Sequence, residues 1–270
     1  MEGLIGDLAV YLALGAVAGT LAGLLGVGGG LVIVPALAWV FARSGFDQAI
    51  LMHLAIGTSL ATIVLTSVSS VRAHHRHGAV EWPIFTRLTP GIVFGAAFGA
   101  WIVDVLPTTT LKVIFGLFAL AVAVQMGFGR PPAPHRGLPG PGGLGMAGGV
   151  IGAVSAVVGI GGGSLTVPFL TYCNRPVRQA VATSAACGLP IAVAGALSFM
   201  FTGWQRPELP AGTTGYVFWP AFGGIVVASM LFAPLGASLA HRMSTTLLKR
   251  FFALFLALVG LRMMWSVISA

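Results

Sequence analysis

The sequence predicts an all-α fold, a polytopic membrane bundle built from two homologous halves with broken, glycine-rich helices. Hydrophobic residues make up 57% of the 270-residue chain and charged residues only 7%, with a mean hydropathy of +0.97. A soluble domain has about 25% charged residues, so this chain lacks the polar side chains that would cover a water-facing surface. The apolar stretches are continuous and do not alternate with period two, which predicts helices rather than a membrane β-barrel.

An internal repeat is the second observation behind this prediction. Residues 15–35 read GAVAGTLAGLLGVGGGLVIVP and residues 148–168 read GGVIGAVSAVVGIGGGSLTVP, so the two segments align without a gap. Further pairs follow in the same order: an A-x-x-T-S element at 55–59 and 180–184, a G-x-V-x-W-P element at 78–83 and 215–220, and a T-T-x-L-K element at 108–112 and 245–249. This shared order is hard to obtain by chance, so we interpret the chain as a duplication.

The domain organisation follows from the repeat. We expect repeat 1 over residues 8–128 and repeat 2 over residues 146–268, each with about four membrane spans of about 20 residues. Residues 129–145 are rich in proline and glycine, which do not propagate a helix, so we expect an extramembrane linker there.

The first apolar stretch of each copy, 8–42 and 146–174, exceeds one span and is interrupted by glycines. Each stretch is therefore either one long broken helix or a span followed by a re-entrant half-helix. Four crossings per copy would make the halves parallel, and five would make them inverted. Lysine and arginine fall almost evenly on alternate loops, so the sequence leaves the topology and the membrane orientation open.

Charge and motifs exclude several classes of function. The net charge is +8, but the basic residues stand singly at the ends of spans, a pattern typical of contacts with lipid headgroups rather than with nucleic acid. There is no G-x-x-x-x-G-K-[ST] phosphate loop, so ATP hydrolysis is not expected. No acid–base or nucleophile constellation predicts an enzyme. The histidines at 74–77 lack a carboxylate pair or a second cluster, so a solvated loop is favoured over a metal site, and we predict no cofactor.

The glycine runs at 26–30 and 159–163 are the first candidate site. Four glycines in five residues remove side chains, admit positive φ and expose backbone N–H groups. A helix that restarts after each run would direct its positive N-terminal end there, which makes a cradle for an anion. Close helix packing is the alternative, and it competes for scattered glycines such as Gly15 and Gly19. The candidate substrate-binding glycines are Gly28, Gly29, Gly30, Gly161, Gly162 and Gly163.

Hydroxyl and basic side chains complete the candidate substrate-binding site. Thr58 with Ser59, and Thr183 with Ser184, lie near the start of a span in each copy, where their hydroxyls can donate to an oxyanion. Bonds within their own helix or to a neighbouring helix are the alternative, and the two interpretations weigh equally. Arg178 precedes Thr183 in the same stretch and would complement an anionic substrate, unless its side chain only extends to the membrane interface.

Together these elements resemble the sulfite exporter TauE/SafE family of membrane transporters. The resemblance rests on the glycine runs that lead to proline, on the A-x-x-T-S and G-x-V-x-W-P elements and on their duplication, and it covers residues 8–268. It implies a multi-pass protein of the bacterial inner membrane that moves sulfur-containing anions such as sulfite or organosulfonates. The candidate glycines and hydroxyls would then line the path. The expected partners are a small anionic substrate and the lipid bilayer, with a homodimer left open.

The function expected from this resemblance is that of a secondary transporter or facilitator for such an oxyanion, with export as the direction. An anion that leaves an inside-negative cell gains about 2.3 kcal/mol per charge per 100 mV, so export needs no coupling ion. All six carboxylates lie at termini or span ends, which agrees with uncoupled transport. The alternative is a membrane-embedded binding or assembly partner without transport activity.

Overall fold

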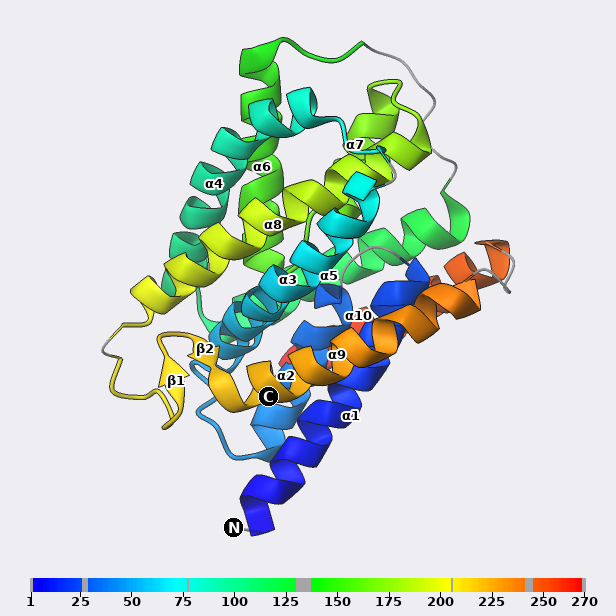
Figure 1. Ribbon diagram of the computed structural model, residues 1–270. Coiled ribbons are helices and arrows are strands. Elements are labelled where there is room, and N and C mark those ends of the chain that lie inside the picture. Colours follow the sequence, from blue (N-terminus) through cyan, green and yellow to red (C-terminus); the bar gives the residue numbers. More distant parts are fainter. Residues whose placement is uncertain are drawn as a thin grey trace.

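The computed structural model describes residues 2–25, 29–76, 78–129, 137–204, 206–240 and 245–268, and within them the chain is helical apart from one short hairpin (Figure 1). The all-α prediction is confirmed. The elements are α1 (Glu2–Leu25), α2 (Gly30–Arg43), α3 (Leu51–Arg76), α4 (Trp82–Val105), α5 (Thr108–Phe128), α6 (Pro141–Val158), α7 (Gly163–Tyr172), α8 (Val177–Thr202), β1 (Thr213–Thr214), β2 (Val217–Phe218), α9 (Trp219–Ala240) and α10 (Thr245–Ile268). The two strands pair antiparallel, with Thr214 opposite Val217.

Helix length and hydropathy make this a multi-pass membrane protein. Among the described residues, seven helices are long and apolar enough to cross a membrane, namely α3, α4, α5, α6, α8, α9 and α10. A shorter apolar stretch, Leu8–Ala22, lies within α1. Large apolar side chains such as Phe94 and Phe128 are exposed on the outside of the bundle, where lipid tails would replace water as their surroundings.

The two long apolar stretches expected at 8–42 and 146–174 are each interrupted, as the glycines predicted. α1 and α2 follow one another across the first glycine run, and α6 and α7 across the second. At 1.5 Å per residue, α2 is about 21 Å and α7 about 15 Å long, which is short of the about 30 Å of a hydrocarbon core. Both are therefore half-helices. α6 begins at Pro141, inside the predicted linker, because proline fits the first turn of a helix.

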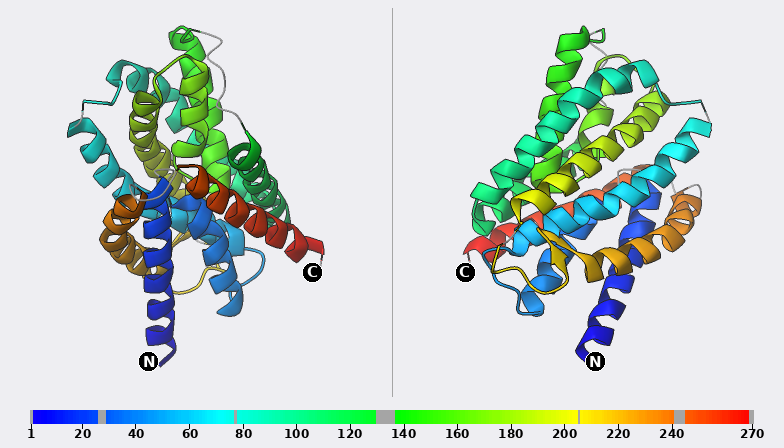
Figure 2. Two further views of the ribbon diagram at one scale, coloured as in Figure 1. Left: turned by 90° about the vertical axis from the view of Figure 1, so that its right-hand side faces the viewer. Right: turned by 60° about the vertical axis from the view of Figure 1, so that its left-hand side comes forward.

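The bundle has two ends, and each is defined by contacts between residues that are far apart in the sequence. At the hairpin end, beside β1 and β2, α4 finishes next to the start of α3, since Thr108 Oγ1 donates to the Ala49 carbonyl at 2.7 Å. At the linker end, beside the start of α6, α4 begins next to the start of α8, since Arg175 forms a 3.3 Å ion pair with Glu81. α3 and α8 lie side by side and run between these ends in opposite directions (Figure 2).

Glycines bring helix backbones into direct contact in the two most extensive helix pairs, α1 with α9 and α4 with α6. A Cβ added at Gly15 would lie 2.5 Å from the carbonyl oxygen of Ile225, and one added at Gly19 would lie 2.6 Å from Ser229 Cα. In the other pair, a Cβ at Gly148 would overlap the carbonyl oxygen of Leu88. The packing interpretation of Gly15 and Gly19 is thereby confirmed.

Gly148→Ala should lower the stability of the folded protein, because the added methyl group must push α6 away from α4. We expect a loss of about 1–3 kcal/mol, the usual cost of overpacking a tight contact, measured as a drop in melting temperature in detergent. Gly145→Ala is the matched control in the same helix, because nothing lies within 4 Å of its added Cβ. Equal melting temperatures for the two variants would contradict the observed contact between α4 and α6.

Candidate functional site

The second glycine run ends one helix and begins another inside the bundle. Gly159 has φ +75°, and the N–H groups of Gly159 and Ile160 donate to the Ser155 carbonyl at 2.9 and 3.0 Å, which closes α6. This left-handed conformation favours glycine, because a Cβ would clash there. Gly162, just before α7, and Gly29, just before α2, both have right-handed φ, at −63° and −73°. Gly28 lies outside the described residues.

The two glycine runs meet. A Cβ on Gly30 would overlap the Gly159 carbonyl oxygen and would lie 2.8 Å from Ile160 Cα. Ser59, in the first half of α3, donates from Oγ to the same Gly159 carbonyl at 2.9 Å. Residues from α2, α3 and the break after α6 therefore share one buried location, which we call the glycine junction.

Ser184 and Gly161 reach the same junction from the other side. A Cβ on Gly162 would lie 2.6 Å from the backbone oxygen of Ser184, and one on Gly161 would lie 3.5 Å from the Ile63 side chain, which also borders Gly30. Gly163 is the first residue of α7. The structure thus groups the described candidate glycines with both candidate serines.

Unsatisfied donors gather around the junction. The N–H groups in the first turn of a helix have no partner within it, and the positive end of the helix dipole lies there. Both α2 and α7 begin at the junction. In addition, several hydroxyl oxygens on α6, α7 and α8 are buried without a hydrogen-bond partner among the described residues, namely those of Ser155, Ser164, Thr166 and Ser184. Buried donors without acceptors are costly, and an oxyanion would satisfy them.

Three of these hydroxyls were not among the residues predicted from the sequence. Ser164 and Thr166 follow the second glycine run directly, so their position at the start of a half-helix is a signal that could have found them. Ser155 precedes the run by one helical turn, and its side chain is fully buried. A serine within a helix commonly bonds a carbonyl of its own helix, so the sequence contains no comparable signal for Ser155.

The candidate threonines have a different environment. Thr58 Oγ1 accepts the backbone N–H of Phe218 at 3.0 Å, and Thr183 Oγ1 accepts that of Glu81 at 2.9 Å. Both side chains are fully buried. Phe218 and Glu81 directly precede α9 and α4, so each threonine caps the start of a helix that is distant in sequence. A hydroxyl that accepts a bond keeps its own hydrogen available for donation.

Arg178 lies apart from the other candidates. It is exposed in the first turn of α8 at the linker end. Ser184 comes six residues later, which corresponds to about 9 Å along the helix axis. The structure therefore leaves the Arg178 guanidinium at the edge of the bundle while it groups the glycines and serines inside.

A second polar cluster occupies the hairpin end, in a cavity of about 310 Å³. Asp104 accepts hydrogen bonds from Tyr216 Oη at 2.8 Å and from Arg206 at 3.0 Å. Burial raises the pKa of the Tyr216 hydroxyl, so the tyrosine stays neutral. His53 lines this cavity, with Nε2 2.9 Å from the Val103 carbonyl. Because Arg206 is paired with a carboxylate, this cluster has little spare positive charge for an anion.

Comparisons with known proteins agree with these features. Residues 11–263 match the family model described as Sulfite exporter TauE/SafE. The chain is 36% identical to a probable membrane transporter protein of Haemophilus influenzae, over 93% of this chain and 96% of that protein. It is 26% identical to a probable membrane transporter protein of Bacillus subtilis over 95% and 97% of the two chains, and 27% identical to one of Methanocaldococcus jannaschii over 95% of each. No solved structure shows a significant match.

Thr183→Val should destabilise the protein, because it leaves the buried N–H of Glu81 without an acceptor. An unsatisfied buried donor costs about 1–3 kcal/mol, and we expect a matching fall in melting temperature. Thr58→Val should behave in the same way through Phe218. Thr183→Ser and Thr58→Ser keep the acceptor oxygen and serve as controls. Equal melting temperatures for the valine and serine variants would show that the threonines do not cap these helices.

Proposed function

Because the chain belongs to the sulfite exporter TauE/SafE family, we propose that it is a secondary transporter or facilitator for a small sulfur-containing oxyanion, sulfite or an organosulfonate. The family expected from the sequence motifs is confirmed. Its members are transporters and not enzymes, so the chain itself is a membrane transporter. The proposal adds the class of substrate, an outward direction and the bacterial inner membrane as the location.

The proposal also includes two homologous halves. It is supported by contacts that recur at matching positions of the two repeats. Aligning the repeats makes Gly148 the counterpart of Gly15, and Leu88 the counterpart of Ile225, and each glycine contacts its partner in the opposite half. The two threonine caps are counterparts in the same way, since Thr58 binds Phe218 and Thr183 binds Glu81. α1 begins at the hairpin end and α6 at the linker end, which supports an inverted relation between residues 8–128 and 146–268.

The glycine junction is the proposed substrate site, and one observation supports it above all. Two half-helices begin where the backbones of the two glycine runs touch, and unpartnered buried hydroxyls lie around them. Paired broken helices at the interface of inverted repeats are the usual place for a transport site. We propose that the first-turn N–H groups at Gly30 and Gly163, together with the Ser184 hydroxyl, coordinate the oxyanion. Ser59 lines the same site and holds the second glycine run in place, because its hydroxyl hydrogen is donated to the Gly159 carbonyl. The threonines then hold the surrounding helices in position.

Export is the proposed direction, because it runs with the membrane potential. A divalent anion gains about 4.6 kcal/mol on leaving a cell at 100 mV, at about 2.3 kcal/mol per charge. The described carboxylates outside α1, which are Asp47, Glu81, Asp104 and Glu208, lie at the ends of the bundle and not at the glycine junction. No acidic side chain at the site is then needed to couple transport to a cation.

Flux into proteoliposomes tests the proposal, with sulfite, thiosulfate, sulfoacetate and taurine compared side by side. We expect saturable uptake of at least one sulfur oxyanion that responds to an imposed potential. The alternative, a membrane-embedded binding or assembly partner, predicts no flux above protein-free vesicles for any of them. Light scattering of the same purified sample would show whether the protein is a monomer or a homodimer.

Ser184→Ala should reduce transport without reducing stability. The Ser184 hydroxyl has no partner among the described residues, so its removal breaks no bond of the folded chain. A lost hydrogen bond to a charged ligand is worth about 1.5–3 kcal/mol, so apparent affinity should fall at least about tenfold. Ser59→Ala is the matched comparison and should lower the melting temperature, because Ser59 bonds the Gly159 carbonyl. Unchanged flux in the Ser184→Ala variant would place the anion elsewhere.

A further inference from the structure

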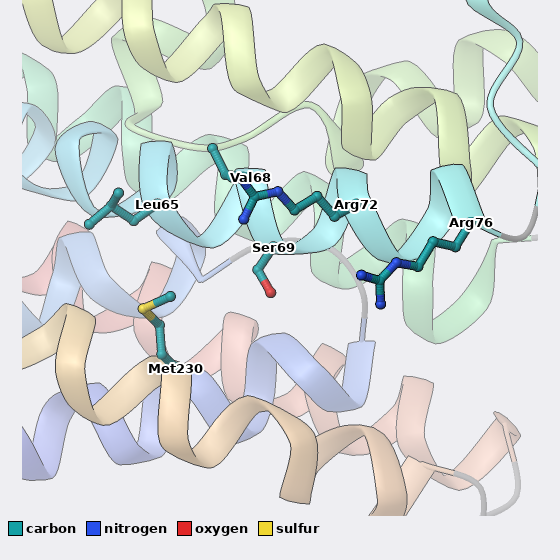
Figure 3. Close-up of a pocket in the computed structure, with 6 residues that line it drawn as sticks. All are labelled: Leu65, Val68, Ser69, Arg72, Arg76 and Met230. Atoms are coloured by element: carbon teal, nitrogen blue, oxygen red, sulfur yellow. The ribbon is translucent and has the colours of Figure 1, made fainter.

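A cavity of about 450 Å³ separates α3 from α9 towards the linker end (Figure 3). Its lining residues on α3 recur every three or four positions, which places them on one face of that helix. Met230 of α9 lies opposite this face (Figure 3). The α3 residues are Leu65, Val68, Ser69, Arg72 and Arg76.

Along the axis of α3, the inner end of this cavity is near the level of the glycine junction. Leu65 comes six residues after Ser59, which corresponds to about 9 Å along the axis. The cavity lies on the side of α3 opposite Ile63, whose side chain borders Gly30 and Gly161, so an anion would pass beside α3 to reach the junction. Arg72 comes nine residues after Ile63, which corresponds to about 14 Å along the axis of α3. One helix thus leads from two guanidinium groups at the outside to the junction inside.

The two arginines that line the cavity are not neutralised. Arg72 and Arg76 are exposed, and no described carboxylate lies within ion-pair distance of either. In contrast, Arg175 and Arg206 are paired with Glu81 and Asp104. Unpaired guanidinium groups facing a cavity create a positive potential that concentrates anions there, and their planar forks match the oxygens of a sulfonate or sulfate group.

The equivalent place in the other repeat has none of these features. Aligning the A-x-x-T-S elements pairs Arg72 with Leu197, Arg76 with Phe201 and Ser69 with Ala194. In addition, α4 packs against α8 more extensively than α9 packs against α3. The cationic opening is therefore confined to the linker end, and its counterpart at the hairpin end is apolar and more closely packed.

The distribution of charge indicates which side of the membrane the linker end faces. Among the described residues, the basic side chains at that end outnumber those at the hairpin end, and the carboxylates show the opposite bias. The linker end has Arg72, Arg76, Arg87, Arg175, Arg178, Lys249 and Arg250 with Glu81, and the hairpin end has Arg43, Lys112, Arg206 and Arg262 with Asp47, Asp104 and Glu208. An excess of lysine and arginine marks the cytoplasmic side of a membrane protein.

We propose that the cavity between α3 and α9 is a cytoplasmic vestibule in which Arg72 and Arg76 collect the oxyanion before it reaches the glycine junction. This inference rests on the proposed function, because it assigns the first contact of the same substrate. The vestibule would also speed capture of the anion from the cytoplasm, while the membrane potential sets the outward direction. A sulfonate or sulfate group is the chemistry that this pair of guanidinium groups recognises.

The charge of the vestibule can be measured without transport. Ser69→Cys places a thiol between the arginines and the junction, and it is reacted with a negatively charged and with a positively charged methanethiosulfonate of similar size. We expect the anionic reagent to react faster, and the ratio of the two rates to fall about tenfold when Arg72→Gln is added, within the range of electrostatic rate enhancements. Wild-type protein gives the background labelling rate, which should be low because Cys173 and Cys187 are buried.

Matched variants and membrane sidedness sharpen this test. Ala194→Cys, the counterpart on α8, should react more slowly and show no preference for the anionic reagent. Ser69→Cys should react in inside-out vesicles and not in intact cells. Leu65→Cys, one turn deeper, replaces it if Ser69→Cys fails to fold. Equal rates for the two reagents, or reaction from the outside alone, would overturn the proposal.

Two further comparisons separate the ligand sources and the two proposals. Free sulfate should protect Ser69→Cys in vesicles of zwitterionic lipid, whereas protection only by anionic lipid would make the arginines headgroup contacts and overturn the vestibule. Sulfate is used because sulfite cleaves disulfides. Charge-selective labelling in a protein that transports none of the tested anions would leave the vestibule standing and refute the proposed substrate. Normal flux with equal labelling rates would support the proposed substrate and refute the vestibule.

Discussion

The direct contact of helix backbones at glycine is the constraint on which the rest of the structure depends. Lipid tails are as apolar as leucine, so helices in a bilayer associate through close packing rather than through the hydrophobic effect. The α1–α9 and α4–α6 pairs reach backbone contact at Gly15 and Gly148. These pairs fix where α4 and α9 begin, and so they place the N–H groups of Glu81 and Phe218 within reach of the two threonine caps.

The same constraint explains how broken helices are tolerated inside a membrane. Each break leaves backbone polar groups that no water can satisfy, and such groups cost several kcal/mol in hydrocarbon. Part of the cost is met locally, since the Ser155 carbonyl accepts two N–H groups and the Gly159 carbonyl accepts the Ser59 hydroxyl. The donors that remain, at the starts of α2 and α7 and on the nearby hydroxyls, are the ones available to a ligand. Stability and binding therefore draw on different polar groups of the same junction.

Much of the fold could be predicted from the sequence, because the bilayer requires long apolar helices. The last helix before the predicted linker, α5, ends at residue 128 as expected, and the breaks fall at the predicted glycine runs. Features that depend on distant contacts could not be predicted. The acceptor role of Thr58 requires a partner 160 residues away, and nothing local to α3 reveals it. The hairpin at 213–218 was also missed, because two-residue strands leave no periodic pattern.

The candidate site was predictable in part for the same reason. Clustered glycines are a local signal, so the junction could be located before its geometry was known. The arginines of α3 stood out only as basic residues at the end of a span, and their direction became clear once α9 was placed opposite them. The proposed membrane orientation also depends on geometry. Each lysine and arginine can be assigned to one end of the bundle only once the structure shows which helices cross the membrane and which are half-helices.

The pairing of α1 with α9 also has a consequence for biosynthesis. Gly15 contacts Ile225, so α1 must wait for a partner that is made about 210 residues later. At about 5–20 residues per second, synthesis of the intervening segment takes about 10–40 s. During that time the small-residue face of α1 is open to unrelated helices in the membrane. Folding of this transporter therefore depends on how long the insertion machinery shelters α1, a requirement that a bundle of sequentially paired helices would not have.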